Sequence, residues 1–308
     1  MADIAHTESP PRPAHARDNR RRRVRTAFRR ERRATERVRL LGQVIDLVRP
    51  EEVLHHLNRW IGEGRKAVVA NHNLHSLYLV RRSPRMQAFY DRADLIELDS
   101  TPLMAFARMI GLNSRGFHRC TYLDWRDAFW SQANRNGWRV MYVGGTAEVC
   151  RIAVERLSAR YPRAVIAATD GYFDATPGAD GNAATVARVA EFRPQILFVG
   201  MGMPRQEEWI IDNLDALPPA AIFSVGAAFD YEAGAQKSAP RWMGRLGVEW
   251  LYRLVADPRR LFRRYCIEPF GLIDLFWADI RAARRRAKAL QVAGGAAGSA
   301  RIQRGSTL

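Results

Sequence analysis

The chain has few cysteines and no long apolar run. Its three cysteines, Cys120, Cys150 and Cys266, are odd in number and lack the spacing of metal ligands, so neither a disulfide framework nor a zinc site is expected. No stretch approaches the roughly 20 apolar residues that span a bilayer, and the first residues lack the apolar core of a secretory signal. These absences predict a metal-free protein of the reducing cytoplasm that neither spans the membrane nor is exported by the usual signal.

Acidic side chains are scarce relative to basic ones, 32 against 49 in 308 residues, which gives a formal charge of +17. The excess lies at the ends: residues 1–40 hold 13 basic and 5 acidic side chains and residues 253–308 hold 12 and 4, whereas residues 41–252 hold 24 and 23. The sign of the charge indicates an anionic partner. A neutral body with two cationic ends favours an anionic membrane surface over a nucleic acid held in a basic cleft.

Composition divides the chain into four segments. Residues 1–40, rich in Pro, Ala and Arg, are expected to form a basic and largely disordered extension, because blocks of like charge repel one another. Residues 41–246 are expected to form the core, residues 247–290 an Arg-rich helical appendage, and residues 291–308 a flexible tail rich in small residues. Whether the extension has a specific role stays open.

Within the core, short apolar runs of strand length alternate with helical stretches. In residues 147–161, for example, Val149, Ala153, Val154 and Leu157 recur at helical spacing. This alternation predicts a Rossmann-like α/β fold, in which helices cover both faces of a mostly parallel sheet. The expected strands are residues 67–70, 93–98, 139–143, 164–168, 195–199 and 221–225.

Ligands of such sheets bind beyond the carboxyl ends of the strands, so the loops there should carry the chemistry. Gly144 and Gly145 join a strand to a helix, where bare backbone N–H groups and the helix dipole favour a phosphate. The alternative is a tight turn that needs glycine for steric reasons alone. Asp170 comes about as many residues after these glycines as the ribose-binding acid does in a nicotinamide dehydrogenase. However, the glycines do not form the G-x-G-x-x-G fingerprint of such enzymes.

Two further loops attract attention. The stretch 200–209 contains Gly202 and Pro204 and then presents Gln206 and Glu207 at a helix start, which indicates either a binding loop or a capped helix. Asp99 follows another apolar run. A carboxylate there can take a proton from an attacking hydroxyl, or it can simply cap the helix that begins after Ser100, and spacing alone favours the cap.

The C-terminal part combines arginines with aromatic residues. The guanidinium group of arginine can donate two hydrogen bonds to diphosphate oxygens, and aromatic side chains are common at the membrane–water interface. From Tyr265 to Ile280 the chain is apolar but too short to span a membrane, and Arg281 and the arginines after it follow. This pattern predicts a helix that lies on the membrane surface; the alternative is a core helix with a solvated basic end.

Several motifs, taken in order over roughly residues 42–265, resemble the WecG/TagA/CpsF family of bacterial glycosyltransferases, glycosyltransferase family 26. The most specific are Gly202-Met203-Pro204-Arg205-Gln206-Glu207 with Trp209, Gly226-Ala227-Ala228-Phe229-Asp230, and Ala239-Pro240-Arg241-Trp242 leading to residues 249–254. Departures concern Asn71, where the family commonly has threonine, Ser100 in place of the glycine of an Asp-Gly pair, and Ser238 in place of an arginine.

The resemblance implies transfer of a sugar from a nucleotide donor, usually a UDP-sugar, to an undecaprenyl-diphosphate-linked saccharide in surface polysaccharide synthesis. It implies no metal ion and no cofactor, and it makes Asp99 the candidate general base, with Asn71 beside it as the second catalytic candidate. The appendage arginines would hold the diphosphate. The expected substrate-binding residues are Asn73, Gly144, Gly145, Asp170, Gly171, Tyr172, Gly202, Pro204, Gln206, Glu207, Asp230, Arg253, Arg260 and Arg263.

The expected partners are therefore a nucleotide-sugar donor, a lipid-diphosphate-linked acceptor and the anionic inner face of the cell membrane, with no specific nucleic acid. Formation of a homo-oligomer stays open. Three other functions are considered: a nucleic-acid-binding protein that uses its Arg-rich ends, a nicotinamide-dependent oxidoreductase, and a noncatalytic scaffold with the same fold.

Overall fold

The computed structural model describes residues 36–236, 243 and 248–305, without the side chains of residues 249, 253, 260, 290 and 292–305. These described residues belong to one compact unit. The Arg-rich extension up to residue 35 and the family motif at residues 239–242 lie outside the described residues.

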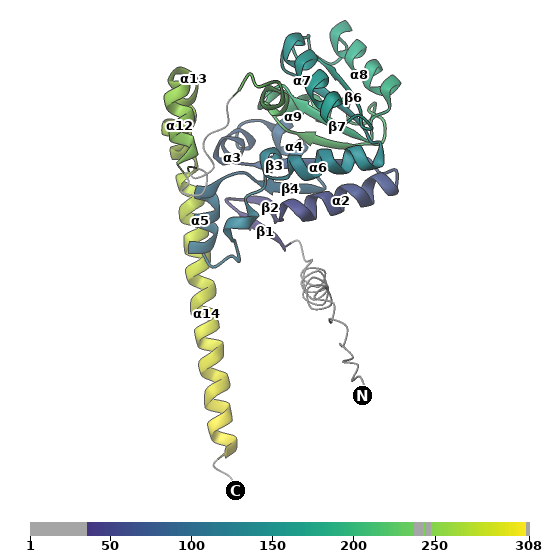
Figure 1. Ribbon diagram of the computed structural model, residues 1–308. Coiled ribbons are helices and arrows are strands. Elements are labelled where there is room, and N and C mark those ends of the chain that lie inside the picture. The colour runs from purple at the N-terminus through teal and green to yellow at the C-terminus, as the bar shows by residue number, and fades with distance from the viewer. Residues whose placement is uncertain (1–35, 237–242, 244–247, 306–308) are drawn as a thin grey trace, which may run out of the picture. The chain divides into compact units, whose positions relative to one another are not determined.

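The centre of the unit is a parallel sheet of six strands (Figure 1). It confirms the predicted mostly parallel α/β fold, and each expected strand forms. Across the sheet the strands are β4 (Leu95–Leu98), β3 (Ala67–His72), β8 (Ala221–Ser224), β7 (Ile196–Gly200), β5 (Arg139–Gly144) and β6 (Val165–Thr169).

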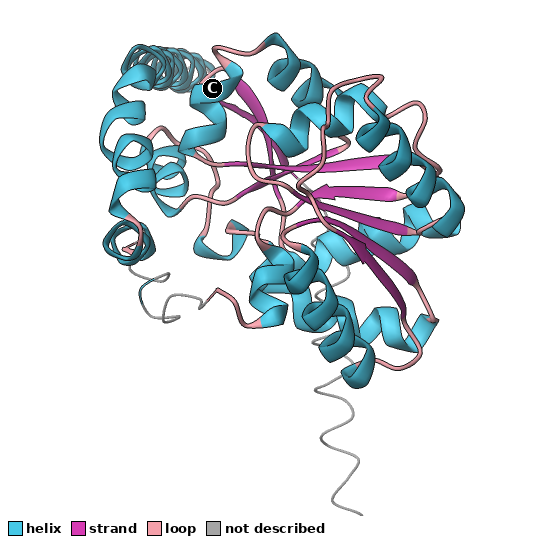
Figure 2. Ribbon diagram, turned by 90° about the horizontal axis from the view of Figure 1, so that it is seen from above, coloured by secondary structure: helices cyan, strands magenta, loops and turns pink. Residues whose placement is uncertain are grey.

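Helices cover both faces of this sheet, because successive strand residues point to opposite sides (Figure 2). In β5, Val140 and Tyr142 join an apolar cluster with α2, α6, α7 and α10, whereas Met141 and Val143 join a second cluster with α3, α4, α8 and α9. The first group is α2 (Pro50–Gly62), α6 (Tyr122–Asn136), α7 (Ala147–Arg160) and α10 (Ala228–Ala233), and the second is α3 (Leu74–Val80), α4 (Pro84–Arg92), α8 (Asp180–Phe192) and α9 (Arg205–Asn213).

An antiparallel hairpin precedes the sheet and was not expected from the sequence. It consists of β1 (Glu36–Leu40) and β2 (Gln43–Leu47), and Leu41 and Gly42 in its turn have φ angles of 50° and 79°, as two-residue hairpin loops require. Asp46, only 2% exposed, accepts hydrogen bonds from the Arg37 guanidinium at 2.8 and 2.9 Å and from the N–H of Ile96 at 2.9 Å. The hairpin is thereby fixed to the edge strand β4.

The C-terminal appendage is helical, as expected from the sequence. It comprises α12 (Glu249–Ala256), α13 (Pro258–Phe262), the short helical turns η2 (Arg263–Ile267) and η3 (Glu268–Leu272), and the long helix α14 (Ile273–Gly305). No helix among the described residues is long and apolar enough to cross a membrane. β1 begins at Glu36, inside the expected extension of residues 1–40, and α14 continues past residue 291 into the expected tail. The segment boundaries at residues 40 and 290 remain predictions.

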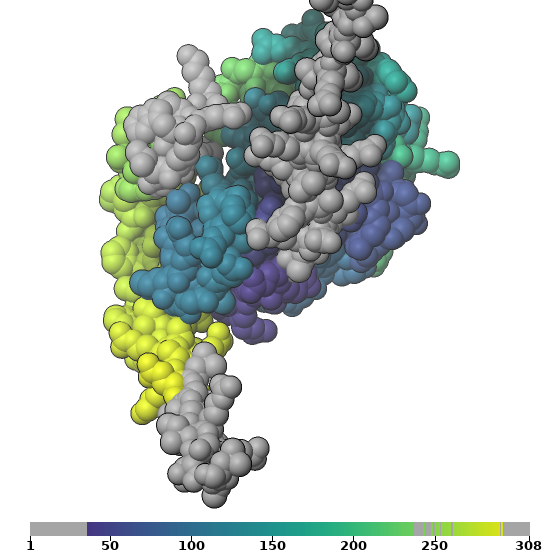
Figure 3. All heavy atoms as spheres, turned by 60° about the horizontal axis from the view of Figure 1, so that its bottom comes forward, coloured from purple at the N-terminus to yellow at the C-terminus, as the bar shows by residue number. Residues whose placement is uncertain are grey.

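The start of α14 packs on the hairpin and on α5 (Thr101–Met109) (Figure 3). The short turn η1 (Gly116–His118) comes after α5 in the chain. Phe276 meets Phe106 edge to face at 4.5 Å between ring centroids, and Asp279 accepts a hydrogen bond from the N–H of Leu41 at 2.7 Å. Leu272 is completely buried in the same cluster. These contacts hold the appendage against the core.

Candidate functional site

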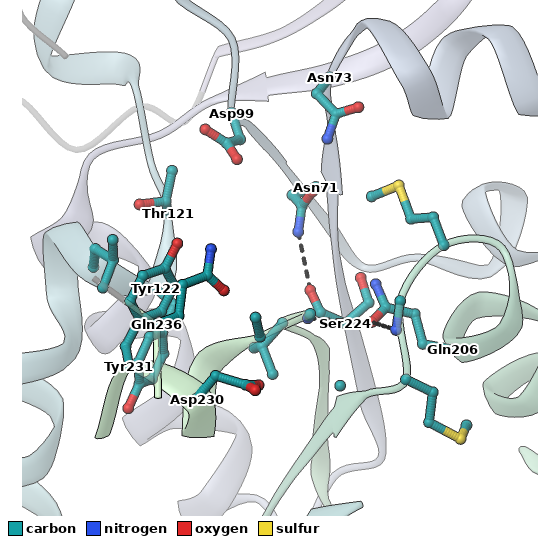
Figure 4. Close-up of a pocket in the computed structure, with 18 of the residues that line it drawn as sticks. Asn71, Asn73, Asp99, Thr121, Tyr122, Gln206, Ser224, Asp230, Tyr231 and Gln236 are labelled. Atoms are coloured by element: carbon teal, nitrogen blue, oxygen red, sulfur yellow. Dashed lines mark hydrogen bonds between the residues drawn. The ribbon is translucent and has the colours of Figure 1, made fainter. Parts of the chain in front are cut away.

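A cavity of about 620 Å³ lies at the carboxyl edge of the sheet (Figure 4). Residues at or just after the ends of all six strands line it: Asn71, Asp99, Gly145, Gly171, Gly200 and Ser224. Because parallel strands end at one edge, this is where such a fold binds ligands. The position is the one expected from the sequence.

Two asparagines at the end of β3 take part in the local structure as well as in the cavity wall. The Asn71 amide donates to the carbonyl oxygen of Ser224 at 2.9 Å and so links β3 to β8 (Figure 4). Asn73 caps α3, since its Oδ1 accepts from the N–H of Ser76 at 3.0 Å. Both capping and bridging fix the orientation of these amides toward the cavity.

Asp99 follows β4 and faces the same cavity (Figure 4). The interpretation of Asp99 as a helix cap is wrong, because Ser100 is the N-cap of α5 and its Oγ accepts from the N–H of Leu103 at 3.3 Å. The Asp99 carboxylate lies 3.8 Å from the Arg119 guanidinium and is 35% exposed. An accessible carboxylate next to a cation can accept a proton from a bound hydroxyl.

Glycines at the carboxyl ends of the strands let neighbouring backbones approach closely. A Cβ on Gly144 would lie 2.4 Å from the carbonyl oxygen of Gly200, and one on Gly171 would lie 2.8 Å from the Cα of Gly144. Gly144 is therefore needed for steric reasons and does not line the cavity, whereas Gly145 does. Gly145 precedes α7, whose N-terminus is capped by Thr146 and supplies N–H groups that suit an anion.

The loop after β7 is held by the side chain of Gln206. Its Oε1 accepts from the N–H groups of Gly202 at 3.2 Å and Gly226 at 3.1 Å, and its Nε2 donates to Glu207 at 2.6 Å. Gln206 and Gly202 line the cavity, but Glu207 is completely buried behind it. Burial raises the pKa of Glu207 to about 8, and its Oε2 has no hydrogen-bond partner among the described residues.

The opposite wall comes from α10 and from the segment after it. Asp230, Tyr231 and Gln236 line the cavity there, next to Thr121 and Tyr122 at the start of α6 (Figure 4). Burial raises the pKa of Asp230 above its usual value. Tyr122 donates to Glu232 at 2.7 Å, which ties α6 to α10.

A smaller cavity of about 220 Å³ adjoins the first, and both have Asn73, Asp99, Arg119, Arg264 and Tyr265 in their walls. The remaining wall of the smaller cavity combines Leu74, His75, Ser100, Thr101 and Pro102 of the core with Trp250 of α12. A hydrogen bond of 2.5 Å between His75 Nδ1 and Glu268 Oε2 connects α3 to the appendage beside this cavity.

The structure brings most predicted site residues together. Those in the wall of the larger cavity are Asn71, Asn73, Asp99, Gly145, Gly171, Tyr172, Gly202, Gln206 and Asp230. Asp170 accepts from the N–H of Tyr172 at 3.2 Å within its own loop, and Pro204 begins the turn into α9. Asp170, Pro204, Glu207 and Arg263 line neither described cavity, and the side chains of Arg253 and Arg260 lie outside the described residues.

Sequence reasoning missed several residues of the cavity wall, among them Glu97, Arg119 and Trp125. Glu97 lies inside β4, two residues before Asp99, where the loop in which ligands were expected begins. Arg119 lies in the connection between α5 and α6, and Trp125 lies in α6. Neither follows a strand of the parallel sheet directly, so the rule that places ligands after strands did not include them. Arg119 forms an isolated parallel bridge with Leu98, which brings it beside Asp99 although the two are far apart in the sequence.

Within the described residues, no three or more His, Cys, Asp or Glu side chains come together in a way that could hold a metal ion. Metal independence remains a prediction. The three cysteines are free, and Cys120 and Cys150 are buried.

Comparison with known proteins bears on the chemistry of this site. The chain matches the model of the glycosyl transferase WecG/TagA/CpsF family over residues 38–288. It is 30% identical over 236 residues to the N-acetylglucosaminyldiphosphoundecaprenol N-acetyl-beta-D-mannosaminyltransferases of the Staphylococcus aureus strains NCTC 8325 / PS 47, COL and MRSA252, an alignment that covers 73% of this chain and 88% of those proteins. The chain therefore belongs to the WecG/TagA/CpsF family of glycosyltransferases.

Proposed function

We propose that this glycosyltransferase moves a sugar from a UDP-sugar to a saccharide linked to undecaprenyl diphosphate, in the synthesis of a surface polysaccharide at the inner face of the cell membrane. The Staphylococcus aureus relatives are named for an acceptor of this kind and for an N-acetylmannosaminyl group. The observation that carries the proposal is the position of Asp99, which belongs to the walls of both the larger and the smaller cavity.

We assign the donor to the larger cavity and the acceptor to the smaller one. At about 620 Å³, the larger cavity has room for a nucleotide sugar, and the N-terminus of α7 offers N–H groups to a diphosphate. The smaller cavity of about 220 Å³ is bordered by Trp250 and Tyr265, whose flat faces suit a saccharide ring. Both assignments place the reacting atoms next to Asp99.

In the proposed reaction, the Asp99 carboxylate takes the proton of an acceptor hydroxyl as that oxygen bonds to the anomeric carbon of the donor sugar. The bond between the anomeric carbon and the diphosphate oxygen breaks, and the nucleoside diphosphate leaves with the electron pair. Arg264, which lines both cavities, and the N–H groups at α7 oppose the negative charge that develops on the leaving group.

Docking on the membrane would bring the lipid-linked acceptor to the smaller cavity. In the appendage, Val255, Phe262, Ile267, Phe270, Ile273 and Trp277 are each at least half exposed. Ile273 and Trp277 continue at helical spacing into Arg281, Arg284 and Lys288, all of them exposed. An apolar stripe that runs into a basic one suits the surface of an anionic bilayer.

The test is transfer by purified protein from a panel of UDP-sugars, with UDP-N-acetylmannosamine included, to a short-chain lipid diphosphate that carries N-acetylglucosamine. We expect transfer from at least one donor. D99N should keep the fold and donor binding, while turnover falls by about 10² to 10⁴, the range for losing acid–base assistance.

A matched control is D124N, which removes a carboxylate from the exposed start of α6 and should leave turnover within a few-fold of wild type. Wild-type turnover in D99N would remove Asp99 from its role. Absence of transfer with every donor, together with tight retention of the whole chain on DNA or RNA, would replace the proposal with a nucleic-acid-binding function.

A further inference from the structure

Glu97 is a second carboxyl group in the wall of the larger cavity, and the mechanism above does not use it. It lies in β4, two residues before Asp99, and it is only 4% exposed. In the sheet it is paired with Asn71 of β3. Side chains of paired residues in parallel strands point to the same face, so Glu97 and Asn71 lie side by side at the cavity floor.

One oxygen of Glu97 is fully engaged by two donors. Oε1 accepts from the Cys120 thiol at 3.2 Å and from the Trp125 indole N–H at 3.2 Å. Cys120 is completely buried and Trp125 is 2% exposed, so these donors hold the carboxyl group in one orientation. The other oxygen, Oε2, makes no hydrogen bond within the described residues, which leaves it for whatever occupies the cavity.

The surroundings oppose a negative charge at this position. Burial is the main cause that raises the pKa of Glu97 to about 8, and the carboxylates of Asp99 and Asp124 add to it. The same environment raises the pKa of the Cys120 thiol well above its usual value, so this neighbour stays a donor. The titratable or charged groups nearby are Asp99 directly after β4, Arg119 and Cys120 in the connection to α6, Tyr122 and Asp124 on α6, and Asp230 on α10.

We propose that Glu97 is a substrate-binding residue that works in its protonated form, with Oε2 donating a hydrogen bond to an oxygen atom of the substrate in the larger cavity. The identity of that substrate rests on the proposed function, but the protonation state of Glu97 does not. The two carboxyl groups then have separate tasks: Asp99 is the ionised acceptor of a proton, and Glu97 is a neutral donor.

Loss of the proton has two effects of the same sign. The donor at Oε2 disappears, and a second negative charge arises two residues from Asp99 and close to the diphosphate of the nucleotide sugar. We therefore expect kcat/KM of the wild-type enzyme to fall about tenfold per pH unit above pH 8. In E97Q the amide N–H₂ replaces the acid proton, so this fall should vanish while activity at pH 7 stays within a few-fold of wild type.

The experiment measures kcat/KM between pH 6.5 and 9.5 for wild type, E97Q, E97A and the control D124N. E97A should lose about 10- to 100-fold at pH 7, the range for removing a hydrogen-bonding group from a binding site, and its profile should lack the fall above pH 8. D124N changes a nearby charge outside the cavity wall and should keep the alkaline fall. A flat wild-type profile, or equal losses in E97Q and E97A at pH 7, would overturn the proposal.

A second measurement is independent of turnover. In protein labelled with ¹³C at the glutamate δ-carbon, two resonances should titrate near pH 8, those of Glu97 and Glu207, and the resonance of Glu97 is the one that is absent from E97Q. If no sugar is transferred but this resonance is seen, the proposed function fails and the neutral state of Glu97 stands. If transfer occurs and Glu97 titrates near pH 4.5, the proposed function stands and the role of Glu97 as a neutral donor is refuted.

Discussion

Phe270 and Trp277 are expected to contribute about as much free energy to binding on an anionic membrane as the five cations that follow them in α14. They keep 71% and 52% of their surface exposed. Burying about 100 Å² of each ring at about 25 cal/mol per Å² contributes about 2.5 kcal/mol per ring. The five exposed cations Arg281, Arg284, Arg285, Arg286 and Lys288 contribute about 1 kcal/mol each near an anionic surface, which makes the apolar and electrostatic parts similar at low salt.

Salt separates the two parts, because the Debye length falls from about 10 Å at 0.1 M to about 3 Å at 1 M. Each part amounts to about 5 kcal/mol, and 1.4 kcal/mol is a factor of ten. At 0.1 M salt we therefore expect F270S/W277S and the variant with all five cations changed to glutamine each to lower the partition coefficient by about 10³ to 10⁴. At 1 M salt, the glutamine variant should bind as wild type does, whereas F270S/W277S should be retained far less.

The assay is co-sedimentation with vesicles of phosphatidylglycerol and phosphatidylcholine. V165S serves as the control, because Val165 is 43% exposed at the amino end of β6, the edge of the sheet opposite the cavities. It should bind as wild type does at both salt concentrations. Equal retention of F270S/W277S and wild type at 1 M salt would refute the assignment of these rings to the membrane surface.

Two further predictions concern stability. L272A removes a completely buried side chain from the cluster that joins the hairpin, α5 and α14, and should cost about 2–5 kcal/mol, measured by urea unfolding, with faster amide exchange in the appendage. The pKa of Glu207 is raised from 4.5 to about 8, so its neutral form stabilises the fold fully below pH 4.5, and this contribution is lost as the pH rises toward 8. E207Q should therefore melt at a higher temperature than wild type at pH 8 and at nearly the same temperature at pH 4.5, whereas an equal difference at both pH values would contradict the pKa of Glu207.

The sheet could be predicted from the sequence because each of its strands is an apolar run that ends in a loop of small or polar residues. Leu197 and Phe198, for example, are buried on opposite faces, so the run shows no alternation and reads as a central strand. The hairpin was missed for the opposite reason. Arg37 and Arg39 place charges at alternate positions of β1, and the many arginines before them make this strand look like part of the basic extension.

The site was predictable where a loop follows a strand and unpredictable where a contact depends on the fold. Asp99, Asn71 and Gln206 were found because they follow apolar runs. Arg119 reaches Asp99 only through the bridge with Leu98, which no spacing in the sequence reveals. Glu207 shows the converse, because an acid in a loop motif looks functional even when its side chain is buried in the core.

The arrangement of the cavity has a consequence for how such enzymes diversify. Six separate loops each contribute a part of the wall, while the two apolar clusters that stabilise the sheet lie on its faces. A substitution in one loop can therefore alter the preference for a sugar without disturbing the interior. New specificities can evolve on this scaffold one loop at a time, at little cost to folding.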